Sequence, residues 1–198
     1  MVQNMRKALL VIDMQEITVG SNHAPVFNYP ADLINKVNAV IEANNGETYS
    51  TDIEETFSDG KYDYRKNMSM AGRGTLVVYI RNLMKDSLIN HFSPVKCYEG
   101  TDAAELAMGL NKVSSYVFRK YSGDAFSNPE FESFIKDMGV SDIEIVGVDG
   151  GGCVSQTALG AVKRGYKVTM NTQAIGTVFL KKRDKYYEQL RRAGVKFI

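Results

Sequence analysis

A cysteine at the junction of a strand and a helix has the setting in this sequence that best suits nucleophilic chemistry. Cys153 follows three consecutive glycines, and these follow the apolar, β-branched run 143–148. Such a run is typical of a strand buried on both faces of a parallel sheet. The small and apolar residues 155–162 predict a helix after the cysteine. Cys153 is therefore expected at a sharp strand-to-helix turn.

A thiol in that turn gains reactivity from its surroundings. The helix N-terminus favours the thiolate through its dipole and free N–H groups, and backbone amides of the turn can point at an oxyanion. The alternative is a structural cysteine, because cysteine is among the residue types most often buried. A cysteine that only packs does not require a glycine-rich turn, so the sequence favours a functional thiol.

Strand and helix patterns alternate along the chain. Strands are expected at 8–12, 75–80, 115–118, 143–148, 166–170 and 194–198. Helices are expected at about 31–43, 129–138 and 181–192, and after Cys153. Strands separated by helices predict βαβ units with right-handed crossovers. We therefore expect one α/β domain over residues 1–198, a three-layer α/β/α sandwich with a mostly parallel six-stranded sheet of Rossmann type.

Three polar residues come at the carboxyl ends of expected strands, where doubly wound folds bind their ligands. Asp13 follows the first strand, Lys120 the third and Cys153 the fourth. Taken singly, Asp13 is equally explained as a strand terminus and Lys120 as a solvated surface charge. Taken together with the thiol, they predict one cleft at this edge of the sheet.

Composition limits the classes of partner. The net charge is +1 and the basic residues are spread out, which gives no footprint for nucleic acid or anionic lipid. The two cysteines form no CxxC pair, which argues against a disulfide framework or a thiolate zinc site. We find no signal-peptide pattern and no apolar run near the ~20 residues that span a bilayer. We expect a cytoplasmic homo-oligomer that acts on a small molecule, without nucleic-acid or membrane partners.

The segment 44–74 fits the alternating pattern least well. It is rich in Asn, Gly, Ser and charged residues, and structureless loops of this length are uncommon in compact domains. We interpret it as an insertion. A lid, a subunit contact and a surface excursion without catalytic part all remain open.

Three motifs, in order along most of the chain, resemble those of the isochorismatase-like cysteine hydrolase superfamily, which includes nicotinamidases, isochorismatases and N-carbamoyl amide hydrolases. They are Ala8-Leu-Leu-Val-Ile-Asp-Met-Gln15, Lys120-Tyr-Ser-Gly-Asp-Ala-Phe126, and Gly147-Val-Asp-Gly-Gly-Gly-Cys-Val154 with Thr157-Ala158 and Gly165-Tyr166. Any one of these motifs is a weak signal, whereas the three together are specific.

The resemblance implies a catalytic trio of Asp13, Lys120 and Cys153. By this resemblance Asp13 takes the thiol proton, Lys120 holds the charges in place, and Cys153 attacks a carbonyl to form a covalent intermediate. It also implies a cis peptide at Val148–Asp149 and an oxyanion hole made by the backbone N–H groups of Asp149 and Cys153.

Departures from the family bear on the substrate. Nicotinamidases of the superfamily bind a metal through an Asp-x-His pair and further histidines, but His23 and His91 are the only histidines here and neither follows that spacing. We therefore expect no metal and no cofactor. At the strand-to-helix turn before Cys153, here called the elbow, Asp149 and the glycines 150–152 replace the residues that are commoner in the family. The identity of the substrate therefore stays open. His91 and Cys97 lie where family members often place pocket residues, but a surface loop and a packing role explain them as well.

The sequence thus predicts a hydrolase that cleaves a C–N bond of a small amide through Cys153. The alternatives are a related hydrolase with a different small substrate and a family scaffold without catalysis, which the 44–74 insertion would favour. A phosphate-binding glycine turn is a weaker alternative, because neither GxGxxG nor GxxxxGK[ST] occurs.

Overall fold

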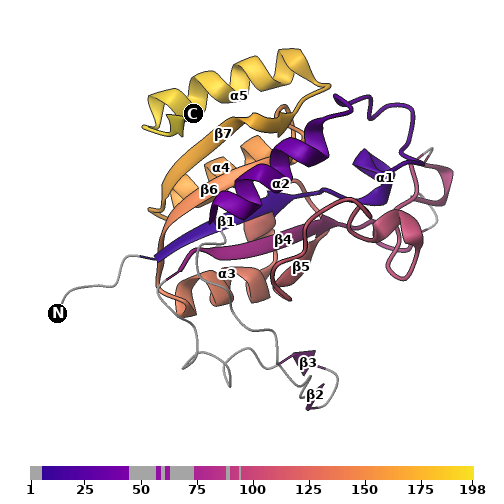
Figure 1. Cartoon of the computed structure of the whole chain (residues 1–198), viewed down its shortest axis with the longest axis horizontal. Coiled ribbons are helices and arrows are strands. Elements are labelled where there is room, and N and C mark those ends of the chain that lie inside the picture. The colour runs from indigo at the N-terminus through magenta and orange to yellow at the C-terminus, as the bar shows by residue number, and fades with distance from the viewer. Residues whose placement is uncertain (1–5, 45–56, 59–60, 63–73, 88–89, 94) are drawn as a thin grey trace.

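A six-stranded sheet, parallel throughout, forms the centre of the computed structural model (Figure 1). The structure describes residues 6–44, 57–58, 61–62, 74–87, 90–93 and 95–198. The sheet order is β5-β4-β1-β6-β7-β8. Its strands are β1 (Arg6–Ile12), β4 (Leu76–Asn82), β5 (Val117–Lys120), β6 (Val140–Val148), β7 (Lys167–Gly176) and β8 (Lys196–Phe197). The predicted α/β class is confirmed.

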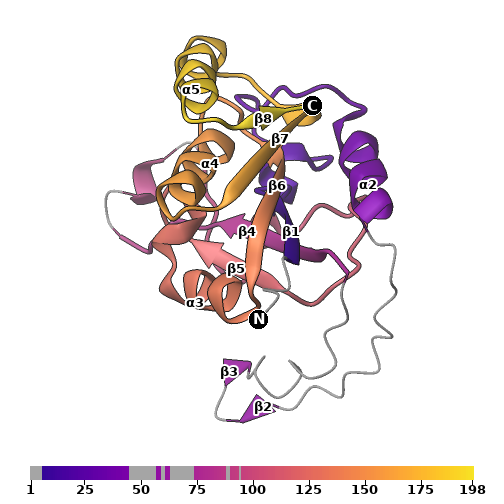
Figure 2. The same ribbon diagram turned by 90° about the vertical axis from the view of Figure 1, so that its left-hand side faces the viewer.

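Helices cover both faces of the sheet, as Figure 2 shows. One face carries α2 (Leu33–Asn44), and the other carries α3 (Pro129–Asp137), α4 (Cys153–Lys163) and α5 (Leu180–Arg192). Short helical turns connect them, namely α1 (Glu16–Val19), η2 (Asn90–Phe92), η3 (Asp102–Ala104) and η4 (Ala125–Ser127). Among the described segments, no helix has the length and apolar character needed to cross a membrane.

The alternation of side chains along β1 explains its uninterrupted apolar sequence. Leu9 and Val11 pack in the core under α2, whereas Leu10 and Ile12 pack on the opposite face with residues of α3 and α4. All four side chains are fully buried. A central parallel strand with helices on both faces needs apolar residues at every position.

Several strand boundaries differ from the prediction, and two of the differences lie in β5 and β7. The strand expected at 115–118 lies at 117–120, so that Lys120 ends β5 instead of following it. The strand expected at 166–170 continues to Gly176, past an irregularity in its pairing with β6 where Thr172 and Gln173 are exposed. Because these two polar residues interrupt the apolar pattern without ending the strand, the sequence pattern did not predict that β7 continues to Gly176.

Most of the segment 44–74 lies outside the described residues. Within it, β2 (Phe57–Ser58) and β3 (Lys61–Tyr62) form a short antiparallel ladder. The roles considered for this insertion stay predictions.

Candidate active site

Four side chains meet where the carboxyl ends of neighbouring strands lie together. Asp13 follows β1, Asn82 ends β4, Lys120 ends β5, and Cys153 begins α4 after β6. Because β5, β4, β1 and β6 are adjacent in the sheet, their ends form one row. The three residues predicted from the sequence are thus brought together, with Asn82 among them.

Lys120 is the centre of this group. Its ammonium Nζ donates to Oδ2 of Asp13 at 2.9 Å, to Sγ of Cys153 at 3.1 Å and to Oδ1 of Asn82 at 3.2 Å. A lysine ammonium has three N–H donors. The three donors of Lys120 are therefore all used within the site.

The Asp13–Lys120 ion pair is removed from water. The exposed fraction of the side chain is 0% for Lys120 and 6% for Asp13. Burial raises the pKa of Asp13 above its ordinary value, although Lys120 and Cys153 act in the opposite direction. For Lys120, burial opposes the charge, but Asp13 and Cys153 outweigh it and raise the pKa. A carboxylate with a raised pKa is a better proton acceptor.

The thiol of Cys153 differs electrostatically from what its position on a helix predicts. Burial and, to a smaller extent, the charge of Asp13 raise its pKa to about 12, because Lys120 only partly offsets them. The expectation that the helix N-terminus makes the resting thiol acidic is therefore wrong. Burial and the neighbouring carboxylate outweigh a single lysine, and a base must remove the proton.

The backbone turns sharply at two places in the site, at Asp13 after β1 and at residues 147–149 at the end of β6. Asp13 has a φ of 51°, in the left-handed region that few residues other than glycine occupy. The peptide bond Val148–Asp149 is cis, as the resemblance implied. Next to it, Gly147 has a φ of 107°, and a Cβ there would lie 2.2 Å from the carbonyl oxygen of Ile12. Glycine at 147 is thus required for β6 to lie against the end of β1.

The glycine run before Cys153 serves close packing. Of the three, a Cβ on Gly150 would lie 2.3 Å from Oγ1 of Thr177, and one on Gly151 would lie 2.2 Å from the carbonyl oxygen of Phe179. None of these glycines has a φ in the left-handed region. The segment before α5 therefore packs directly onto Gly150 and Gly151 and leaves no room for a side chain at either position, whereas a Cβ on Gly152 would make only ordinary contacts.

Asp149 holds the elbow in place. Its Oδ1 accepts from the backbone N–H of Gly151 at 2.6 Å, and its Oδ2 accepts from the N–H of Val178 at 2.6 Å and the hydroxyl of Tyr29 at 3.2 Å. The residue is 7% exposed. Both carboxylate oxygens are thus occupied by the protein itself.

A cavity of about 200 Å³ opens onto the thiol. Aromatic and aliphatic side chains form much of its wall. The polar part comes from Asp13, Gln15, Thr18, Asn82, Ser93 and Asp149, and from the thiols of Cys97 and Cys153. The apolar members of the wall are Ile17, Phe27, Tyr29, Met84, Val95, Val148 and Phe179. Within the described residues, the backbone N–H groups of Asp149 and Cys153 have no acceptor on the protein. The cavity can hold a small molecule with an apolar body.

Gln15 and Asn82 belong to the site but were not predicted from the sequence. Gln15 is fully buried and its side-chain amide pairs with both backbone groups of Asn82, accepting at 2.7 Å and donating at 3.2 Å. The expected second strand stopped at residue 80, two positions before Asn82. A strand extended to its true end would have shown Asn82 beside the other three carboxyl-end residues.

Cys97 and the histidines contribute differently. Cys97 lines the cavity but is 4% exposed, and its Sγ donates to the carbonyl of Asn82 at 3.1 Å. His23 is exposed and contacts the carbonyl of Gly20. The side chain of His91 lies outside the described set. Among the described residues, no group of three His, Cys, Asp or Glu side chains is arranged to hold a metal ion.

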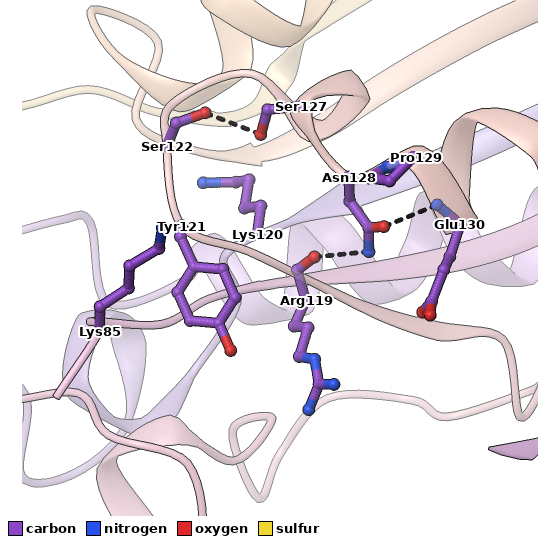
Figure 3. Close-up of a pocket in the computed structure, with 9 residues that line it drawn as sticks. All are labelled: Lys85, Arg119, Lys120, Tyr121, Ser122, Ser127, Asn128, Pro129 and Glu130. Carbon is purple, nitrogen blue, oxygen red and sulfur yellow. Dashed lines mark hydrogen bonds between the residues drawn. The ribbon is translucent and has the colours of Figure 1, made fainter.

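A second hollow, of about 380 Å³, lies beside the end of β5 and the start of α3 (Figure 3). Arg119 and Lys120 point in different directions there, and Arg119 pairs with both oxygens of Glu99 at 2.7 and 2.8 Å. Ser122 and Ser127 bond each other, while Asn128 caps α3. Many polar groups around this hollow thus form hydrogen bonds within the protein. The ammonium of Lys120 instead contacts side chains that line the thiol cavity.

The fold and the row of polar side chains at its carboxyl edge define an α/β protein with a thiol-containing cavity. A family model for the isochorismatase domain matches residues 7–198, and the chain therefore belongs to the isochorismatase family. Its members are hydrolases, including amidases that act on C–N bonds other than peptide bonds. No curated protein matches the sequence.

Solved structures share the fold at low sequence identity. An isochorismatase-like hydrolase from Alkaliphilus metalliredigens superposes with a TM-score of 0.72 at 18% identity, over 98% of this chain and 93% of that one. N-carbamoylsarcosine amidase from Thermoplasma acidophilum gives 0.69 at 20%, over 98% and 95%. Pyrazinamidase of Pyrococcus horikoshii, solved with zinc, gives 0.69 at 20%, over 98% of both chains. At these identities the likeness extends to the fold alone.

Proposed function

We propose that this protein is a cysteine hydrolase that cleaves a C–N bond of a small amide through a covalent intermediate on Cys153. The observation that carries the proposal is the placement of Lys120 Nζ within hydrogen-bond distance of both the Asp13 carboxylate and the Cys153 sulfur. A nucleophile, a base with a raised pKa and a buried cation between them make up the parts of a covalent mechanism.

In the first half of the reaction Asp13 accepts the thiol proton while the sulfur attacks the substrate carbonyl carbon. The resulting oxyanion lies against the backbone N–H groups of Asp149 and Cys153, which have no acceptor on the described protein. Collapse of this intermediate breaks the C–N bond, and Asp13 returns the proton to the departing nitrogen as ammonia or an amine. Lys120 keeps its charge throughout and stabilises the anionic sulfur.

In the second half a water molecule attacks the thioester carbonyl. Asp13 accepts the proton of this water, the C–S bond breaks, and the sulfur recovers the proton. The product is a carboxylic acid, or a carbamic acid where the substrate is a ureide. No step requires a metal, and the elbow amides supply the polarisation of the carbonyl.

A screen of small amides and ureides for ammonia release, run beside Cys153→Ala, tests the proposal. Turnover by the wild type that is lost in Cys153→Ala and retained in Cys97→Ala is the expected result. Activity that survives in Cys153→Ala would exclude the covalent mechanism. An absence of turnover across the screen would favour a non-catalytic scaffold, the alternative from another functional class.

We also infer a cytoplasmic location and a homo-oligomeric state. Both thiols are unpaired, which suits a reducing compartment. Met108 and Phe92 expose 92% and 89% of their surface, and such side chains are commonly covered in an assembly. Light scattering of the purified protein tests the assembly, and a monomer at micromolar concentration would contradict it.

A further inference from the structure

The side chain of Asn82 enters the cavity from a fixed backbone. Gln15 pairs with both the N–H and the carbonyl of this residue, and the thiol of Cys97 donates to the same carbonyl. Gln15 is fully buried and bonds the carbonyl of Ala104 as well, at 2.9 Å. Asn82 is therefore held at the end of β4 before any ligand arrives.

The orientation of the Asn82 amide follows from its contact with Lys120. An ammonium only donates, so the oxygen Oδ1 must face Nζ, at 3.2 Å. The nitrogen Nδ2 then points away from Lys120 with two N–H donors. Within the part of the chain that the structure describes, Nδ2 has no acceptor, and it is not among the buried polar atoms that lack a partner. It is thus reachable from the cavity.

The charges around the cavity restrict what Asn82 can bind. No lysine or arginine is among the described residues that line this cavity. Lys120 lies behind them, and its three donors are used by Asp13, Cys153 and Asn82. Two carboxylates, Asp13 and Asp149, line the same space. A ligand that carries a carboxylate would find no free counter-charge here and would be repelled.

We propose that Asn82 contacts the substrate directly, and that Nδ2 donates a hydrogen bond to an acceptor atom on the body of a compact, uncharged amide. The acceptor is an atom other than the scissile carbonyl oxygen, which the elbow amides receive. This inference rests on the proposed function of the same cavity. Asn82 thereby selects a substrate of one chemical class, an uncharged amide with a second acceptor.

Four amides of nearly equal shape test the contact. Benzamide has no acceptor in its ring, whereas pyridine-2-carboxamide, pyridine-3-carboxamide and pyridine-4-carboxamide each place a ring nitrogen at a different position. Each amide is measured with the wild type, Asn82→Leu and Asn82→Asp. The first variant removes both contacts of the side chain, and the second keeps an oxygen facing Lys120 but has no N–H donor.

Two readouts separate this inference from the proposed function. The first is kcat/KM for any amide that is turned over. The second is the equilibrium Kd measured by calorimetry on the Cys153→Ala background, which does not depend on catalysis. Each amide is compared with itself between two proteins, so differences in the intrinsic reactivity of the amides cancel.

The expected result is that one pyridine carboxamide loses about 10-fold in kcat/KM and affinity in both variants, relative to the change for benzamide, as for the loss of one hydrogen bond. An equal loss for all four amides would mean that Asn82 acts only through Lys120, and would overturn the proposal. So would an unchanged preference, or an absence of binding by all four amides. A further outcome would overturn the proposed function alone. In it, the Asn82 variants no longer distinguish the pyridine carboxamide from benzamide in Kd, while Cys153→Ala keeps full activity.

Discussion

The ammonium of Lys120 lies 2.9 Å from the carboxylate of Asp13, although β4 separates their strands in the sheet. The long side chain of Lys120 crosses the end of β4 and contacts Asn82 there. The pair is buried, so each charge depends on the other for stabilisation. This dependence makes the site sensitive to single substitutions.

Lys120→Met should destabilise the fold as well as abolish turnover. The Asp13 carboxylate would be left buried without its cation, at a cost of about 3–5 kcal/mol in the free energy of unfolding. With the cation gone, burial raises the pKa of Asp13 further. A carboxyl group with a raised pKa in the folded state favours folding at low pH, and this contribution is lost as the pH rises. The loss of stability relative to the wild type should therefore be larger at pH 8 than at pH 5. Urea unfolding at both pH values measures this loss of stability.

The double variant Lys120→Met with Asp13→Asn is the control, and it should recover part of the stability but no activity. Equal stability of Lys120→Met and the wild type would contradict the buried ion pair.

Brief treatment with iodoacetamide should label Cys153 before Cys97. Cys97 is the more deeply buried thiol and donates to the Asn82 carbonyl, whereas Cys153 is partly exposed and lies on the wall of the cavity. Burial raises the pKa of Cys97 to about 11, so neither thiol is acidic. Peptide mapping by mass spectrometry identifies the label. Preferential alkylation of Cys97 would count against Cys153 as the reactive thiol.

Asp13→Asn should make Cys153 easier to alkylate at neutral pH while hydrolysis is lost. Asp13 raises the pKa of Cys153 and Lys120 lowers it, so removal of the carboxylate shifts the thiol pKa downwards. The rate of alkylation against pH should therefore turn upwards at lower pH in the variant than in the wild type. A profile that is unchanged, or shifted to higher pH, would show that Asp13 does not control this thiol.

Asp149→Ala should destabilise the elbow. Three donors, the N–H groups of Gly151 and Val178 and the hydroxyl of Tyr29, would lose their acceptor. Unsatisfied buried groups of this kind predict a loss of about 2–4 kcal/mol in the free energy of unfolding. Tyr29→Phe is the matched control, since it removes one donor and leaves the other two bonds, and should cost below about 1.5 kcal/mol. An equal loss in the free energy of unfolding for the two variants would argue against the view that Asp149 stabilises the elbow through all three hydrogen bonds.

Turnover of any amide found in the screen should survive exhaustive dialysis against EDTA. The elbow amides are expected to polarise the carbonyl, and the described residues offer no group of three metal ligands. Metal analysis of the purified protein accompanies the assay. If activity is lost on chelation and returns with added metal, Asp149 and the histidines must be reconsidered as ligands.

The sequence by itself determined the class of fold and three members of the site. The fully apolar strand at 8–12 requires helices on both faces of a parallel sheet, and this local pattern needs no knowledge of distant residues. Asp13, Lys120 and Cys153 could be placed at one edge because every parallel strand in such a sheet ends at the same side. Periodicity and strand direction are properties of short segments, and they are readable in the sequence.

Only the tertiary structure decided the electrostatics of the site and the contacts of Asn82 and Asp149. The helix N-terminus suggested an acidic thiol, yet the packing around Cys153 buries it beside a carboxylate and raises its pKa to about 12. Asp149 interacts with Val178 and Tyr29, and Lys120 with Asn82, across large separations along the chain. Burial and pairwise contact depend on how all segments pack, so no local pattern of residues could have predicted them.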